Sequence, residues 1–219
     1  MSYPRLLPVG DIAFTIEFGN AVDRDLSLQV HAFDAQLQAD PFPALIETIP
    51  SYRSLLIVFD PQIQPRSEVR EVLSSALLSP APTQELPRGR LLEIPVCYGG
   101  ACGPDLTEVA RHCKLSETEV IRRHSTPEYL VAMLGFSPGF AYLLGLLPEL
   151  ATPRLSTPRL SVPAGSIGIA DQQTGIYSLR TPGGWQLIGR TQLTLFDPGR
   201  PEPFTLRAGD RIRFVPSHA

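Results

Sequence analysis

One stretch of the chain, residues 135–191, most constrains what the protein can fold into. Glycine and proline are dense in it, and short runs of β-forming residues lie between them. Glycine lets the backbone take positive φ values or approach a ligand closely, whereas proline fixes φ. A hydrophobic core alone rarely needs so many fixed turns among aromatic residues and arginines. The stretch therefore predicts a β-rich site in which loops hold polar groups over an apolar floor.

The composition excludes several classes of protein. The 219 residues are 43% hydrophobic and 19% charged, which favours a packed core over global disorder. A net charge of −3 and a pI of about 5.8 disfavour a nucleic-acid partner. No run approaches the ~20 apolar residues of a membrane span, and residues 1–5 lack the apolar run of a signal peptide. We therefore expect a cytoplasmic protein that does not associate with a membrane.

The cysteines give no sign of a metal centre. There are three, Cys97, Cys102 and Cys113, and an odd number suits a reduced interior better than a disulfide framework. His112 precedes Cys113, but the spacing fits no common closed zinc site, so no metal is expected.

The first half of the chain predicts a small α+β domain. The expected strands are Ile12–Phe18, Leu45–Ile49, Ser54–Phe59 and Leu91–Val96, and the expected helices begin near Asp23 and at Pro65. This order, β-α-β-β-α-β, is typical of a ferredoxin-like domain, although the last strand is compatible with either half. A proline-rich segment at residues 79–90 predicts the boundary, which divides the chain into residues 1–88 and 89–219.

The second half predicts two short helices followed by a barrel. Asp105 with Glu108, and Ser116 with Glu119, have the spacing of helix capping boxes. The expected strands are Tyr129–Leu134, Ser166–Ala170, Gly175–Leu179, Gln186–Arg190, Leu193–Phe196 and Arg211–Val215. Strands this short, with turns this regular, indicate a closed or nearly closed all-β barrel.

Three arginines are candidates for binding an anion. Arg154 and Arg159 each follow a proline in a turn-rich segment, and Arg190 ends an expected strand. The planar fork of a guanidinium suits a carboxylate or a phosphate. We predict that these arginines bind a small anionic substrate; the alternative is three ordinary surface residues.

Other candidates surround these arginines in the sequence. Gln173, Thr174 and Tyr177 are expected either to orient a carboxylate or amide, or to satisfy buried backbone groups. His124 precedes the stretch and is a candidate proton relay; the alternative is a role at the end of its helix. The expected apolar walls of the pocket, which are equally compatible with plain core, are Phe136, Phe140, Tyr142 and Trp185.

The chain has no recognisable nucleophile. Ser137 does not lie in a Gly-x-Ser-x-Gly elbow, Ser166 has no identifiable histidine partner, and no carboxylate pair is evident. We therefore expect this chain to carry part of a site, with the remainder supplied by a partner.

Several of these motifs together resemble one family. They are GFSPGFAYL at residues 135–143, the two Pro-Arg pairs, VPAGSIGIA at 162–170, QTGIY at 173–177, PGGWQLIGRT at 182–191, IPVCYGG at 94–100 and GPDL at 103–106. They resemble the KipI/PxpB family, whose members are the B-type subunit of 5-oxoprolinase, allophanate hydrolase subunit 1 and sporulation kinase inhibitors. The resemblance covers essentially the whole chain.

This resemblance implies a fold, partners and a reaction. The implied fold is a ferredoxin-like first domain and a cyclophilin-like β-barrel second domain. The implied partners are a KipA/PxpC-type subunit and a LamB/YcsF-type subunit, which together with this chain use ATP to open 5-oxoproline to glutamate. The alternatives are a regulator that inhibits a sensor histidine kinase, and a subunit of the allophanate hydrolase or urea carboxylase type.

Overall fold

The computed structural model describes residues 3–78 and 89–217. The chain divides into two compact units, Met1–Arg88 and Gly89–Ala219. Each unit has its own cluster of buried apolar side chains, as expected for an independent core.

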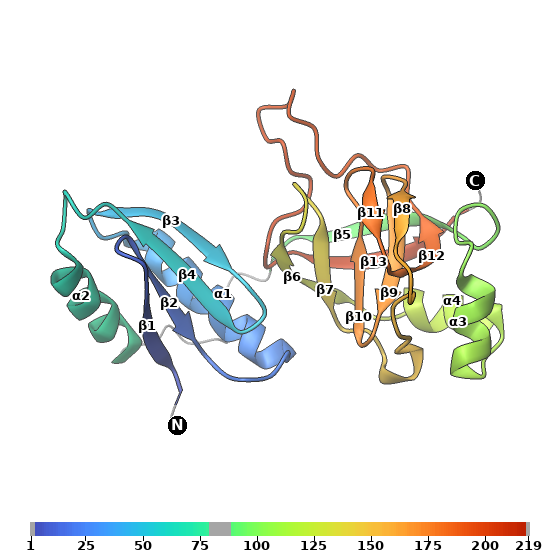
Figure 1. The fold of residues 1–219 in the computed structure, drawn as a ribbon, viewed down its shortest axis with the longest axis horizontal. Helices are drawn as coiled ribbons and strands as arrows, with labels where there is room; N and C mark the ends of the chain where they lie inside the picture. The colour runs from blue at the N-terminus through green and yellow to red at the C-terminus, as the bar shows by residue number, and fades with distance from the viewer. Residues whose placement is uncertain (1–2, 79–88, 218–219) are drawn as a thin grey trace. The chain divides into compact units, whose positions relative to one another are not determined.

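The first unit is a four-stranded antiparallel sheet with two helices. Its elements are β1 (Arg5–Val9), β2 (Ala13–Glu17), α1 (Arg24–Ala39), β3 (Leu45–Pro50), β4 (Ser54–Phe59) and α2 (Arg66–Leu78). The strand order is β1-β2-β4-β3, and Figure 1 shows α1 lying along one face of this sheet. Asp23 caps α1 because its carboxylate accepts hydrogen bonds from the backbone amides of Asp25 and Leu26.

The ferredoxin-like prediction for this unit is wrong. The observed order is β-β-α-β-β-α, because Arg5–Val9 forms an edge strand and the expected last strand pairs elsewhere. That strand, β5 (Leu91–Tyr98), belongs to the barrel of the second unit, where it lies parallel to β13 (Arg211–Pro216). Strand β1 was not predicted because it contains Pro8, and proline is tolerated in strands chiefly at sheet edges.

The second unit contains the predicted closed barrel. Its strand order is β10-β7-β6-β13-β5-β12-β9, closing on itself. The strands not yet defined are β6 (Tyr129–Leu134), β7 (Ala141–Leu144), β9 (Ser166–Ala170), β10 (Gln173–Ile176) and β12 (Gln186–Arg190). The β5–β13 pair is parallel and every other neighbouring pair is antiparallel.

Two helices and a small ribbon complete this unit. Helices α3 (Leu106–Cys113) and α4 (Glu117–Ser125) pack together beside the barrel (Figure 1). A short 3-10 helix, η2 (Pro148–Leu150), contacts both helices. Strands β8 (Arg159–Val162) and β11 (Thr181–Gly183) form a separate two-stranded sheet. The expected strand Leu193–Phe196 is not formed; only an isolated bridge joins Phe196 to Phe204.

Candidate functional site

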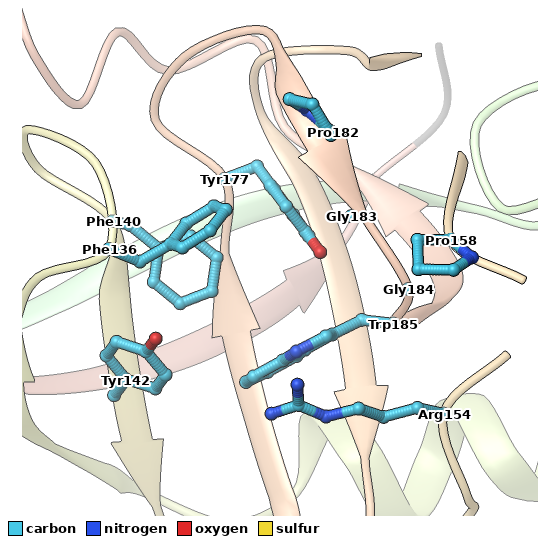
Figure 2. A pocket seen from close by; sticks show the side chains of 10 residues that line it. All are labelled: Phe136, Phe140, Tyr142, Arg154, Pro158, Tyr177, Pro182, Gly183, Gly184 and Trp185. Atoms are coloured by element: carbon cyan, nitrogen blue, oxygen red, sulfur yellow. The ribbon is translucent and has the colours of Figure 1, made fainter. Parts of the chain in front are cut away.

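The candidate site is a cavity of about 340 Å³ in the second unit (Figure 2). The residues that line it are Phe136, Phe140, Tyr142, Arg154, Pro158, Tyr177, Pro182, Gly183, Gly184 and Trp185. They come from the loop after β6, from β7, from the segment before β8, from the residue after β10, and from β11 and its connection to β12. The barrel therefore fixes the apolar wall, while turns rich in proline and glycine hold the remaining groups.

Aromatic rings form the wall by packing edge to face. The Phe140 ring lies 5.0 Å from Tyr177 and 5.5 Å from Trp185, at interplanar angles of 90° and 85°. Tyr142 adds a contact to Trp185 with a centroid separation of 5.9 Å. Centroid separations and angles of this kind are the favourable geometry for aromatic pairs. The rings therefore pack against one another, and their faces and edges set the shape of the cavity.

Phe136 lies at the mouth of the cavity in a strained conformation. Its φ is +65°, in the left-handed region that bulky residues rarely adopt, and its side chain is 64% exposed. Two backbone hydrogen bonds, from Gly135 N to Phe140 O and from Phe140 N to Ser137 O, hold the turn that contains it. A strained and exposed aromatic residue is typical of a ligand or partner contact, because the core does not require it.

Arg154 supplies the positive charge in the cavity. Its guanidinium carbon lies 5.7 Å from the centre of the Trp185 ring, an arrangement favourable for a cation–π contact (Figure 2). Among the residues that the structure describes, no hydrogen bond or ion pair engages this guanidinium. Its donors therefore remain available to an anion that enters the cavity.

Tyr177 presents a hydroxyl to the same space. Burial raises the pKa of Tyr177, although a hydrogen bond from the Trp185 backbone and the charge of Arg154 oppose the shift. The phenol thus stays protonated, and its hydroxyl can donate a hydrogen bond to a ligand. A side chain at Gly183 would place a Cβ 2.3 Å from the Tyr177 hydroxyl oxygen, so only glycine fits there.

Arg159 lies behind this wall and is already paired. Its Nη2 donates to Asp105 Oδ1 at 2.6 Å, and its Nη1 lies 3.5 Å from the carbonyl oxygen of Trp185. Asp105 was expected to cap α3, but its side chain makes no capping hydrogen bond. The carboxylate instead accepts from Arg159 and from the backbone amide of Leu187.

The remaining predicted hydrogen-bonding residues lie elsewhere on the barrel. Arg190 is exposed at the end of β12 and donates from Nε to the carbonyl oxygen of Ala164 at 3.0 Å. Gln173 is half-buried at the start of β10, and Thr174, the next residue, is fully buried. None of these three residues lines the cavity described above.

His124 belongs to a buried network that determines its protonation. Thr174 Oγ1 donates to Gly168 O at 2.9 Å, so at 3.0 Å it accepts from His124 Nε2, which must carry the proton. His124 Nδ1 then accepts from the Tyr98 hydroxyl at 2.8 Å. Burial lowers the pKa of His124 to about 3, so the ring stays neutral. The ring nitrogens of His124 and the hydroxyl of Thr174 are all hydrogen-bonded within the core, and His124 does not line the cavity.

Six of the eleven predicted site residues thus line the cavity, and five do not. The six in the cavity are Phe136, Phe140, Tyr142, Arg154, Tyr177 and Trp185, and the five outside it are His124, Arg159, Gln173, Thr174 and Arg190. Sequence reasoning did not assign Asp105, Pro158, Pro182, Gly183 or Gly184 to the site. The Pro-Gly-Gly run before Trp185 was the available signal for the last three.

The described residues form neither a metal cluster nor a membrane-spanning helix. No group of three or more His, Cys, Asp or Glu side chains among them is placed to hold a metal ion. No described helix is both long enough and apolar enough to cross a lipid bilayer.

Comparison with known proteins identifies the family. A family model for the carboxyltransferase domain, subdomain C and D, matches residues 4–206. The B-type subunit of 5-oxoprolinase from Bacillus subtilis is 47% identical over 217 residues, covering 94% of this chain and 90% of the relative. The chain belongs to the family of B-type 5-oxoprolinase subunits. Its cavity is therefore a feature of a carboxyltransferase-type domain within that family.

Solved structures share the fold of this chain. The crystal structure of TTHA0988 is 38% identical with a TM-score of 0.82, over 94% of this chain and 40% of that chain. This chain therefore spans less than half the length of TTHA0988. The urea carboxylase of Kluyveromyces lactis is 18% identical with a TM-score of 0.71, over 97% of this chain and 22% of that chain, and shows a shared fold.

Proposed function

We propose that this chain is the subunit of an ATP-dependent 5-oxoprolinase that binds a small anionic substrate or intermediate in the aromatic cavity. The observation that carries the proposal is the Arg154 guanidinium, which lies over Trp185 without a partner for its donors among the described residues. A carboxylate fits this group, and the aromatic wall fits the flat face of a lactam ring. The membership of the family supports the assignment of the reaction.

The residues of the cavity bind and orient rather than perform hydrolysis. Opening 5-oxoproline requires water to add across the ring amide, so that one C–N bond breaks and a second carboxylate and an amine appear. Of the described residues, no carboxylate, histidine, cysteine or serine lines the cavity to activate that water or attack the amide. We assign those groups, and the ATP that drives the step, to a KipA/PxpC-type and a LamB/YcsF-type partner subunit.

Reconstitution tests this proposal. The three chains are co-expressed and purified, and glutamate and ADP formation are measured with and without 5-oxoproline. We expect glutamate production to require this chain, and the R154Q variant to lose most of it while the complex still assembles. Full activity of the two partner chains alone would overturn the proposal.

Exposed apolar residues beside the cavity favour one alternative function. Leu160 is 93% exposed on β8, which pairs with the cavity-lining β11, and Phe136 is exposed at the mouth. An exposed apolar rim of this kind suits contact with another protein. We infer that a second role, inhibition of a sensor histidine kinase, would use this rim. A titration of kinase autophosphorylation that stays flat at high protein concentration would rule out this role.

A further inference from the structure

The two Pro-Arg arginines have different electrostatic surroundings. Arg154 lines the cavity and has no acidic partner in the described part of the chain. Arg159 is five residues further on, and its guanidinium forms an ion pair with Asp105. The two side chains of that pair are only 30% and 12% exposed, so solvent screens the attraction less than it would at the surface.

Asp105 is held in place by more than this ion pair. Its Oδ2 accepts from the Leu187 amide at 2.6 Å, and its own amide donates to the Leu187 carbonyl at 2.9 Å. Leu187 lies two residues beyond Trp185, and Arg159 Nη1 lies 3.5 Å from the Trp185 carbonyl oxygen. Asp105 therefore fixes both the guanidinium of Arg159 and the start of β12, which directly follows Trp185 of the cavity wall.

The net charge near the cavity follows from this arrangement. The Arg159–Asp105 pair sums to zero, and no acidic side chain of the described residues lines the cavity, so Arg154 contributes one uncompensated positive charge. A ligand with one negative charge is matched by this charge. A second negative charge on the ligand would lack a partner in a site walled by aromatic rings, which is unfavourable.

We propose that Asp105 is the residue that sets the charge selectivity of the cavity, by neutralising Arg159 so that the site accepts ligands with a single negative charge and rejects those with two. This inference rests on the proposed function, because it concerns the same cavity. It identifies Asp105 as a positioning residue, and it separates the roles of Arg154 and Arg159.

The single tryptophan of the chain provides the measurement. Trp185 lines the cavity, so its fluorescence reports binding directly. The purified full chain is titrated at pH 7.5 with 5-oxoproline, a monoanion, and with succinate, a dianion. We expect 5-oxoproline to bind at least tenfold more tightly. In D105N the Arg159 charge is no longer matched, and we expect this ratio to fall roughly tenfold.

A charge-balanced double variant separates selectivity from folding. D105N/R159Q removes both charges of the pair, so we expect it to restore the preference for 5-oxoproline. If D105N weakens the binding of both acids equally and leaves their ratio unchanged, Asp105 has only a structural role and this inference fails alone. If the unmodified protein binds neither acid, the proposed function fails and this inference fails with it.

Discussion

The aromatic cavity and the His124 network both contain residues that the sequence predicts as candidates, yet the two regions differ in how their polar groups are satisfied. In the network, the ring nitrogens of His124 and the hydroxyl of Thr174 all have protein partners. In the cavity, the donors of Arg154 and the hydrogen of the Tyr177 hydroxyl remain available. A polar side chain whose donors have no protein partner is therefore a better candidate for ligand binding than one chosen by residue type alone.

Replacing Thr174 with valine tests the structural side of this comparison. The variant keeps the shape of the side chain but removes the acceptor of His124 Nε2 and one donor to the Gly168 carbonyl in the core. We expect the free energy of unfolding to fall by about 3 kcal/mol, measured by chemical denaturation. The matched control, T174S, keeps the hydroxyl and should lose much less. Equal losses in the two variants would show that the hydroxyl is unimportant.

Replacing Arg154 with glutamine tests the binding side. The loss of one charge-assisted contact to a carboxylate is expected to weaken 5-oxoproline binding about thirtyfold. Trp185 fluorescence gives the affinity, and the thermal midpoint should change little, because among the described residues only the cation–π contact with Trp185 is lost. R190Q removes an exposed arginine outside the cavity and should bind normally. Equal weakening in both variants would contradict the assignment of Arg154.

Acid should destabilise the protein through His124. Its pKa is about 3 in the folded protein and about 6.5 when unfolded, so between these values the unfolded state binds more protons. The free energy of unfolding should therefore fall as the pH drops below 6.5, by up to about 1.4 kcal/mol per pH unit. Denaturant titrations at pH 6.5 and 5.0 measure this, because carboxylates stay mostly ionised in that interval. An H124Q variant with the same pH dependence would contradict the prediction.

Removing the Tyr177 hydroxyl should have the smallest effect. Y177F keeps the ring in the aromatic wall and deletes one neutral donor, so we expect 5-oxoproline binding to weaken about fivefold. The same fluorescence titration measures it, and Y129F, in which the altered hydroxyl bonds to His124 O in the core, is the control. Unchanged binding in Y177F would show that this hydroxyl does not contact the ligand.

Local patterns predicted much of the barrel. The expected strands Tyr129–Leu134, Ser166–Ala170 and Gln186–Arg190 have the bounds that the structure shows. Short strands that interrupt the pattern escaped prediction: β7 is four residues long, and β11 contains a proline and a glycine. The prediction for the first unit is wrong because β5 pairs with β13, more than a hundred residues away, and with β12, and no local pattern in the sequence indicates these pairings.

Only those site residues that lie close together in the sequence could be predicted from residue type and position. The aromatic wall and Arg154 lie within one stretch whose turns signalled a site. The partner of Arg159 is 54 residues away in sequence, so the ion pair with Asp105 was not visible. The sequence position of His124 favours a proton relay, whereas its complete burial depends on how α4 packs beside the barrel.

The position of β13 between β5 and β6 has a consequence for biosynthesis. Every residue that lines the cavity, up to Trp185, has been added to the growing chain before residues 211–216 can complete the ring of strands. The first unit can fold while the second is still being translated. The aromatic residues of the cavity, in contrast, stay without their enclosing scaffold until β13 has been synthesised, so they are exposed in the nascent chain up to that stage.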